Sequence, residues 1–300
     1  MKSATAFLRF VYFYGMKKFS LLLLLVCAAC AQDSKLEILG DLPADLSENS
    51  ACEVIGNTIW TAQDHGNKAI LYAVDRSGKI QQSVNIDDIK NEDWEDLTSD
   101  KNGNLYIGDI GNNDNKRKDL TIYKIAASDL NRANASIAQK TTFNYPEQTE
   151  FPPKKSARFF DCEAFFEKDG YFYLFTKNRS SSFDGTTFLY KVPNKSGHHI
   201  AVKIGEYKTC GKFNRCAITA ADISPDGKKV ALLTGDKVFL FSGFSSDAFL
   251  DGTSEIIELN DFSQKEGLGF STDDEILITD EKTKKIGGHL YHLNLSETKP

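Results

Sequence analysis

An acidic residue followed at a regular distance by a second polar residue, which closes a short apolar strand, recurs five times along this chain. Four of the five spacings are 14 residues, and the first is 11 residues. The pairs are Glu53 with Asp64, Glu95 with Asp109, Glu163 with Lys177, Asp222 with Asp236, and Glu266 with Asp280. A unit made only of strands that repeats every ~40–50 residues is typical of a β-propeller.

Each unit contains four short strands. The acid lies in the first strand, and a turn rich in Gly, Asn and Asp, such as residues 101–104, leads to the apolar second strand. The third strand centres on an aromatic residue, for which we expect a packing role between blades. These residues are Tyr72, Tyr123, Tyr190, Phe241 and Tyr291. The predicted fourth strands lie at 80–86, 140–145, 200–207 and 255–259.

The fifth unit ends after its third strand, near Leu293. Residues 36–39 have the character of a fourth strand and can complete this last blade, which closes the ring and removes a free sheet edge. We therefore predict an all-β fold, a β-propeller of five four-stranded blades closed by an N-terminal strand. A sixth blade within residues 126–160 is the alternative. Residues 31–300 are predicted to be a single propeller domain.

The charge of the chain argues against some classes of partner. The formal net charge is −6, and four basic residues without any acid lie among the first 29 residues. The remaining domain therefore carries about −10, which disfavours binding to nucleic acid or to an anionic membrane surface.

The N-terminus has the features of a targeting segment, with Met16-Lys17-Lys18 followed by an apolar run and small residues. We interpret residues 1–30 as an upstream extension plus a lipoprotein-type signal peptide, with translation starting at Met16. Cys30 is then the lipidated residue, and the protein lies in the cell envelope, at the outer membrane or in the periplasm. Membrane contact would be made through the lipid anchor alone. Cleavage before Gln32, giving a soluble secreted protein, is the alternative.

Export permits disulfides, and the domain holds four cysteines. Cys210 and Cys216 flank a short loop, so we predict a disulfide between them. Cys52 and Cys162 each precede the acid of a repeat by one residue, and we expect them to be buried thiols. No spacing of Cys and His indicates zinc.

The repeat predicts that the five polar pairs meet at one end of the central channel. The first residue of a hairpin lies opposite its last, so each pair should be a pair of cross-strand neighbours, and blade rotation brings all of them to one face. Three polar loops, 111–118, 178–182 and 281–285, should open on the same face. The candidate ligand-binding residues are Glu53, Asp64, Glu95, Asp96, Asp161, Glu163, Lys177, Asp222, Glu266 and Asp280.

Carboxylates so close together repel unless a cation or hydrogen-bond donors compensate them. Calcium suits oxygen ligands of this kind, and the candidate metal ligands are Glu95, Asp109, Asn112 and Asn113. Each single acid has a structural alternative, a hydrogen bond to backbone N–H groups of the neighbouring blade. Lys177 can form an ion pair with Glu163 or bind an anion. Among the histidines only His65 falls at this end, and no nucleophile motif is present.

Several segments together resemble the bacterial secreted propellers described as SdiA-regulated or as phytase-like esterases. They are 93–96, 105–113, 161–164 with 176–177, 223–227, and 266–267. The resemblance covers about residues 50–295. It implies a propeller whose acids at the channel mouth hold calcium ions that position a phosphate, although no segment of this chain matches a phosphate-binding motif.

These observations predict an extracytoplasmic β-propeller lipoprotein, a monomer, that binds a small molecule or an envelope component at an acidic channel mouth, with calcium as the candidate cofactor. A calcium-dependent phosphoester or ester hydrolase is the first alternative. A purely structural envelope scaffold is the second.

Overall fold

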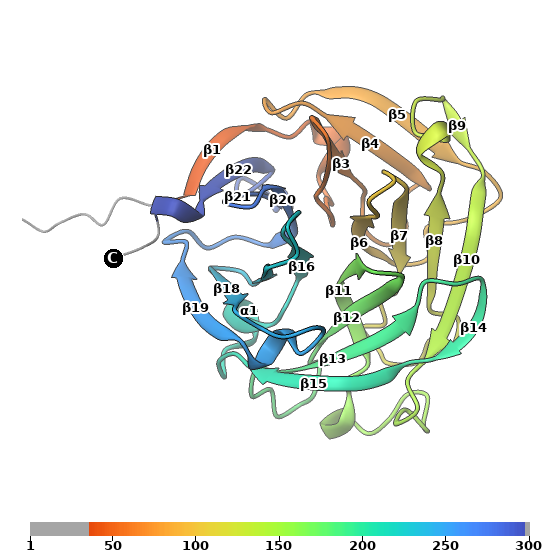
Figure 1. Cartoon of the computed structure of the whole chain (residues 1–300), viewed down its shortest axis with the longest axis vertical. Coiled ribbons are helices and arrows are strands. Elements are labelled where there is room, and N and C mark those ends of the chain that lie inside the picture. Colours follow the sequence, from red (N-terminus) through yellow and green to blue (C-terminus); the bar gives the residue numbers. More distant parts are fainter. Residues whose placement is uncertain (1–35, 298–300) are drawn as a thin grey trace, which may run out of the picture. The chain divides into compact units, whose positions relative to one another are not determined.

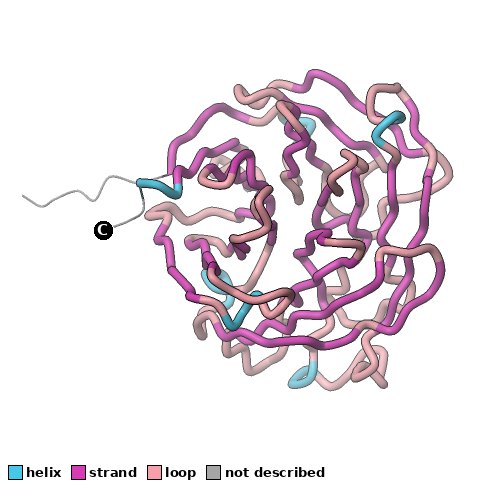
Figure 2. The backbone as a smooth tube through the Cα atoms, in the orientation of Figure 1, coloured by secondary structure: helices cyan, strands magenta, loops and turns pink. Residues whose placement is uncertain are grey.

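A computed structural model of the chain describes residues 36–297, and these residues form a ring of five sheets (Figures 1 and 2). The prediction of a β-propeller with five four-stranded blades is confirmed. No helix among the described residues is long and apolar enough to cross a membrane.

Each blade is a meander of four strands that runs from the channel outward. Blade 1 contains β2 (Glu53–Ile55), β3 (Thr58–Thr61), β4 (Ile70–Val74) and β5 (Ile80–Ile86). Blade 2 contains β6 (Trp94–Ser99), β7 (Leu105–Asp109), β8 (Thr121–Ile125) and β10 (Ile137–Asn144). Blade 3 contains β11 (Asp161–Lys168), β12 (Tyr171–Lys177), β13 (Thr186–Pro193) and β15 (Val202–Lys208). Blade 4 contains β16 (Ala220–Ile223), β17 (Lys229–Leu233), β18 (Lys237–Ser242) and β19 (Thr253–Glu258).

Blade 5 is completed by the N-terminal strand, as the sequence predicted. It contains β20 (Lys265–Thr272), β21 (Glu275–Asp280), β22 (His289–Asn294) and β1 (Leu36–Asp41). Ile38 lies opposite Tyr291 in the antiparallel pairing of β1 with β22 (Figure 1). This pairing joins the two ends of the described chain in one sheet, so the last blade has no missing strand.

Two short extra strands add to the outer edges of the first two blades. The segment 126–160 does not contain a sixth blade, because β9 (Asn134–Ala135) pairs parallel with β5 and β10 completes blade 2. Likewise β14 (Gly197–Ile200), which belongs to the connection of blade 3, pairs parallel with β10. Each extra strand therefore ties one blade to the blade before it.

Within residues 36–297, helical structure is confined to single turns. The α-helix α1 spans Phe213–Cys216, and five 3₁₀ helices span Ala44–Leu46, Ala127–Asp129, Lys155–Ala157, Phe249–Asp251 and Leu295–Glu297. A disulfide joins Cys210 to Cys216 and encloses α1, in agreement with the predicted pairing. Cys52 and Cys162 are buried and unpaired.

The core lies between adjacent blades. Between blades 2 and 3, Phe172 packs against Tyr106 and Phe165 with ring centroids 5.1 and 5.9 Å apart. All three rings are almost fully buried, which stabilises the interface by burial of apolar area and by edge-to-face ring contacts. The packed blades thereby form a rigid frame that positions the side chains at the channel mouth.

Candidate functional site

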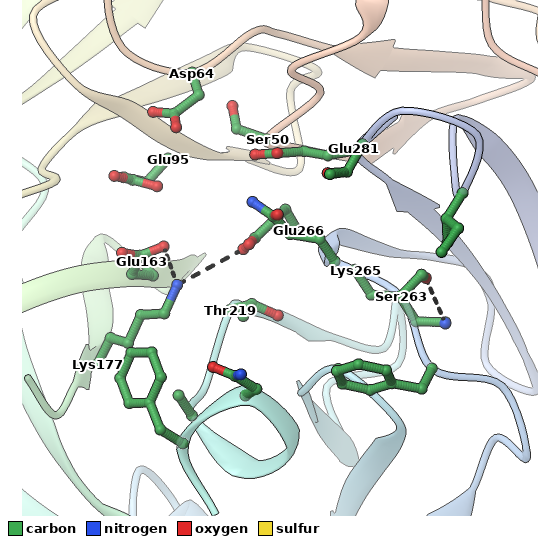
Figure 3. Close-up of a pocket in the computed structure, with 18 of the residues that line it drawn as sticks. Ser50, Asp64, Glu95, Glu163, Lys177, Thr219, Ser263, Lys265, Glu266 and Glu281 are labelled. Carbon is green, nitrogen blue, oxygen red and sulfur yellow. Dashed lines mark hydrogen bonds and ion pairs between the residues drawn. The ribbon is translucent and has the colours of Figure 1, made fainter. Parts of the chain in front are cut away.

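A cavity of about 970 Å³ opens at the end of the channel where each first strand begins and each second strand ends. Its polar wall includes Asp64, Glu95, Glu163, Glu266 and Glu281, and Figure 3 shows these side chains around one space. The convergence of acids from different blades at one mouth is what the repeat predicted. The set of acids that line the cavity differs from the predicted set.

Three of the wall residues reach the cavity through the same backbone feature, a β-bulge in the first strand. The register shifts between Trp94 and Asp96, between Cys162 and Ala164, and between Lys265 and Gly267. The extra residue in each bulge is a glutamate: Glu95, Glu163 and Glu266. Because a bulge turns the extra side chain out of the regular alternation, we infer that the bulges direct these three glutamates into the cavity.

The predicted pairing holds approximately in the three bulged blades and is wrong in the other two. In blades 2 and 5 the second polar residue lies opposite the residue just before the glutamate, as with Asp109 and Trp94, and in blade 3 Lys177 lies opposite Asp161, two residues before Glu163. In blade 1 Glu53 lies opposite Trp60 and not Asp64, and in blade 4 Asp222 lies opposite Ala231 and not Asp236. Asp64 reaches the cavity from the loop between β3 and β4, whereas Asp236 forms ion pairs with Arg215 and Lys237.

Three predicted ligand-binding acids, Glu53, Asp96 and Asp222, are used to join blades. Asp96 accepts a hydrogen bond from the backbone N–H of Phe165 in blade 3 at 3.1 Å, and Asp222 accepts one from Phe270 in blade 5 at 2.7 Å. Glu53 hydrogen-bonds to Ser99 in blade 2. None of the three lines the cavity. Their contacts agree with the alternative role considered for such acids, a hydrogen bond to the neighbouring blade.

Two further predicted ligand-binding acids are fully buried and bonded to protein donors. Asp161 accepts hydrogen bonds from Arg179 Nε at 2.5 Å and from the backbone N–H of Asn112 at 2.6 Å. Asp280 accepts hydrogen bonds from the backbone N–H of His289 and from the Tyr291 hydroxyl, both at 2.7 Å. These contacts keep both carboxylates in the wall of the blade and away from the cavity surface.

The predicted set of metal ligands does not form one cluster. Asp109 accepts a hydrogen bond from Arg117 at 2.8 Å, and the Asn112 amide bonds to the backbone of Phe160 and Arg117. Of that set, Glu95 and Asn113 line the cavity. The structure instead groups Asp64, Asp93 and Glu95, whose nearest carboxylate oxygens lie within 4.8 Å of one another.

Gly111 allows this acidic trio to form. A Cβ atom at Gly111 would lie 2.2 Å from Glu95 Oε1 and 2.5 Å from Asp93 Oδ2, closer than real Cβ contacts. The backbone N–H of Gly111 also bonds to the Asp93 carbonyl. Gly111 therefore contributes a close backbone approach, and of the two asparagines that follow it Asn113 lines the cavity.

Opposite charges compensate only part of the acidic wall. Lys177 Nζ lies 2.9 Å from Glu163 Oε2, and Arg179 donates hydrogen bonds to both Glu163 and Asp161. Burial by itself would raise the pKa of Glu163, but Lys177 and Arg179 outweigh it and lower the pKa to about 2. Glu163 is therefore ionised at neutral pH.

The remaining acids of the mouth have raised pKa values. Burial, followed by the charge of Asp64, raises the pKa of Asp93 to about 6. Burial raises the pKa of Glu266 to about 7, and burial together with Glu266 and Asp64 raises that of Glu281 to about 8. Glu95 is almost fully buried, and burial, followed by the charge of Glu163, raises its pKa. These groups lack a strong cationic partner, so a bound cation would lower their pKa values.

Two hydroxyl groups at the cavity also lack partners. Ser50 is 2% exposed and Thr219 is 7% exposed, both line the cavity, and neither hydroxyl oxygen makes a hydrogen bond within the described chain (Figure 3). Buried polar groups are normally hydrogen-bonded, so these two hydroxyls are sites where a bound polar molecule would gain contacts.

Sequence reasoning missed Asp93, Arg179, Glu281, Ser50 and Thr219. Asp93 and Glu95 are two residues apart, and the alternation of a strand would have placed both on one face. Arg179 and Glu281 belong to two of the polar loops that the sequence assigned to the mouth. No sequence pattern marks Ser50 or Thr219 as a site residue.

Neither a protein-family model nor a curated protein matches this chain. The functional assignment therefore depends on the geometry and chemistry of the site.

Proposed function

We propose that this protein is a cell-envelope β-propeller that binds a divalent cation at Asp64, Asp93 and Glu95 and holds a ligand in the adjoining cavity. The observation that carries the proposal is the acidic trio, whose carboxylate oxygens lie within 4.8 Å of one another. Calcium is the first candidate, since it prefers carboxylate and amide oxygens, and Asn113 adds an amide oxygen to the same wall.

The electrostatics of the mouth support a bound cation. Arg179 and Lys177 are already engaged with Glu163, and His65 Nδ1 is 3.7 Å from Asp93 on a side chain that is 72% exposed. A divalent ion at the trio would offset the mutual repulsion of Asp64, Asp93 and Glu95. The hydroxyls of Ser50 and Thr219 then provide further contacts for the ligand.

Calcium binding can be measured directly. We expect calcium to raise the melting temperature and to give a saturable signal in isothermal titration calorimetry, because a ligand bound only by the folded state stabilises it by about 2.7 kcal/mol at 100 times its Kd. Asp93→Asn should weaken calcium binding at least tenfold. Asp169→Asn, which removes an exposed acid far from the mouth, is the matched control. Wild-type protein with no calcium response would reject the metal site and favour a structural role for the acids.

A calcium-dependent phosphoester or ester hydrolase is the second candidate function, as in the phytase-like propellers that the sequence resembles. One observation favours it: Glu95 and Glu163 line the same cavity, where burial and Glu163 raise the pKa of Glu95 while Lys177 and Arg179 lower the pKa of Glu163, so the site offers a candidate acid and a candidate base. When bound, calcium would polarise a phosphoryl oxygen. A panel of phosphate and carboxylic esters tests this function, and turnover that requires both calcium and Glu95 would support it.

The proposed location in the cell envelope depends on Cys30, which lies outside the described residues. The disulfide between Cys210 and Cys216 agrees with an oxidising compartment.

A further inference from the structure

One side of the cavity wall is apolar, in contrast to the acidic side. Phe213, Phe262 and Ile286 line it together with Ala217. Phe262 is 47% exposed and Ile286 is 65% exposed, so both are open to solvent although they are large and apolar. Apolar groups left open to solvent at the edge of a ligand cavity indicate contact with an apolar part of the ligand.

The aromatic rings of this wall are held in place by their neighbours. The guanidinium group of Arg215 lies 4.8 Å from the ring centre of Phe262 and forms an ion pair with Asp236. The Phe213 ring packs edge-on against Phe183 at 5.2 Å. It belongs to α1, which the disulfide between Cys210 and Cys216 encloses. Contacts with neighbouring residues therefore hold both aromatic rings of this wall in place.

Two carboxyl groups lie on the other side of this part of the cavity. Glu266 and Glu281 both line the cavity there; Glu266 is directed toward Lys177, and Glu281 lies close to Ser50 (Figure 3). The nearest cation to Glu266 is Lys177 at 3.9 Å, but Lys177 makes its shorter contact with Glu163. The pair Glu266 and Glu281 thus has room for a positively charged group from a ligand.

Positive charge is found at the rim, on the hairpin between β21 and β22. Lys284 and Lys285 line the cavity, are exposed, and form no ion pair within residues 36–297. The same hairpin carries Ile286. The wall of one cavity therefore presents carboxyl groups, apolar side chains and ammonium groups to a ligand.

We infer that the ligand of the cavity is a short peptide with a free N-terminus and apolar side chains. Its ammonium group would lie between Glu266 and Glu281, its side chains against Phe213, Phe262 and Ile286, and its carboxylate near Lys284 and Lys285. The inference rests on the proposed function of this cavity as a ligand site. A ligand with charge of one sign would leave either the acids or the rim lysines without a partner. The volume of about 970 Å³ lies at the upper end of the ~300–1,000 Å³ typical of ligand sites, and thus suits several residues.

Isothermal titration calorimetry with the tripeptide Leu-Phe-Leu at constant calcium tests the inference. We expect binding of the free tripeptide and at least tenfold weaker binding of its N-acetylated form, which has no ammonium group. The C-terminal amide should bind more weakly by a smaller factor, because the rim lysines are exposed to solvent. Equal binding of the free and N-acetylated forms, or no binding of either, would overturn the inference.

Substitutions of the residues that line the cavity test where the peptide binds. The double variant Glu266→Gln with Glu281→Gln should bind the free tripeptide at least tenfold more weakly than the wild-type protein does. Its affinity for the N-acetylated form should be unchanged. Ile286→Ala should weaken the binding of both forms several-fold, whereas Ile256→Ala, which alters another exposed isoleucine, on β19, should weaken the binding of neither. An equal effect of Ile256→Ala and Ile286→Ala would argue against the apolar wall as the contact surface.

The peptide inference and the calcium proposal can fail separately. Loss of peptide binding in a protein that still binds calcium overturns the peptide inference alone. Peptide binding without any calcium response in wild-type protein overturns the metal proposal and keeps the peptide site. Calcium affinity that is unchanged in the Glu266 and Glu281 variant shows that the fold and the trio are intact in that variant.

Discussion

The ammonium group of Lys177 lies 2.9 Å from a carboxylate oxygen of Glu163, and both side chains are almost fully buried, at 9% and 4% exposure. Lys177 ends the second strand of blade 3, and Glu163 is the bulge residue of the first strand. The bulge brings the two charges together at the cavity wall, where solvent screens them poorly.

Removal of one member of this pair should be strongly destabilising. Lys177→Met leaves Glu163 with Arg179 as its remaining basic partner, and breaking a buried ion pair costs about 3–5 kcal/mol. Urea unfolding measures the loss. The double variant Lys177→Met with Glu163→Leu should recover part of it, because it leaves no unpaired charge at this pair. The exposed pair Lys101–Asp169 serves as the control, with an expected cost below about 1 kcal/mol.

Ring closure by β1 should contribute a large part of the stability. Deletion of residues 36–41 exposes the edge of β22, and we expect a much lower melting temperature or aggregation. Gly40→Ala is a milder test, since a Cβ at Gly40 would lie 2.2 Å from the Ser77 carbonyl oxygen in blade 1. Ile38→Ala, at a side chain that is 55% exposed, should change the melting temperature little. An unchanged melting temperature after the deletion would contradict closure by β1.

Gly111→Ala should damage the acidic trio. The added methyl group would meet Glu95 Oε1 and an Asp93 oxygen, so one of the two carboxylates must move. We expect calcium affinity to fall at least tenfold while the far-ultraviolet circular dichroism spectrum of the propeller stays the same. Gly211→Ala, at a position where a Cβ meets nothing within 4 Å and the backbone is not left-handed, controls for the general cost of replacing a glycine in a loop. Normal calcium affinity in Gly111→Ala would place the cation elsewhere.

Stability in the absence of cations should fall as the pH rises. The pKa values of Glu266 and Glu281 are raised to about 7 and about 8, above the ordinary glutamate value of 4.5. The folded protein thus holds these protons more tightly than the unfolded chain does. The resulting contribution to the free energy of unfolding is present at pH 4.5 and is lost as the pH rises through 8. We expect the melting temperature to drop by about 5 °C between pH 5.5 and pH 8.5. In a domain of this size, a loss of 1 kcal/mol in the free energy of unfolding lowers the melting temperature by about 2–4 °C.

Two further measurements identify the groups responsible for this pH effect. Glu281→Gln should reduce the drop in melting temperature, because glutamine has no proton to lose. Calcium should reduce it as well, by favouring ionised carboxylates at the mouth. A melting temperature that rises over the same pH range would contradict the raised pKa values.

Lipid attachment predicts where the protein is found. If Cys30 is lipidated, the wild-type protein should separate with the membrane fraction, and Cys30→Ala should release it or block its processing. Mass spectrometry of the mature N-terminus distinguishes the two cleavage sites. A protein found only as a soluble chain that begins at Gln32 would reject lipid attachment in favour of secretion.

The sequence by itself determined the architecture, because strand alternation, turn residues and a repeat length are local properties that can be counted along the chain. The five blades, the aromatic third strands and the completion of blade 5 by residues 36–39 were all predicted in this way and confirmed. The convergence of acids at one channel mouth also follows from the repeat.

Only the tertiary structure decided which acids face the cavity. A one-residue bulge marks Glu95, Glu163 and Glu266, which line the cavity, whereas Glu53 and Asp222, the repeat acids of the two blades without this bulge, bond to the next blade. The sequence pattern is the same in both cases, and the difference depends on which backbone N–H groups of another blade lie within hydrogen-bonding distance. The grouping of Asp64 with Asp93, like the apolar wall of Phe213, Phe262 and Ile286, depends on distances between loops far apart in sequence. Such distances are set by the packing of the whole ring.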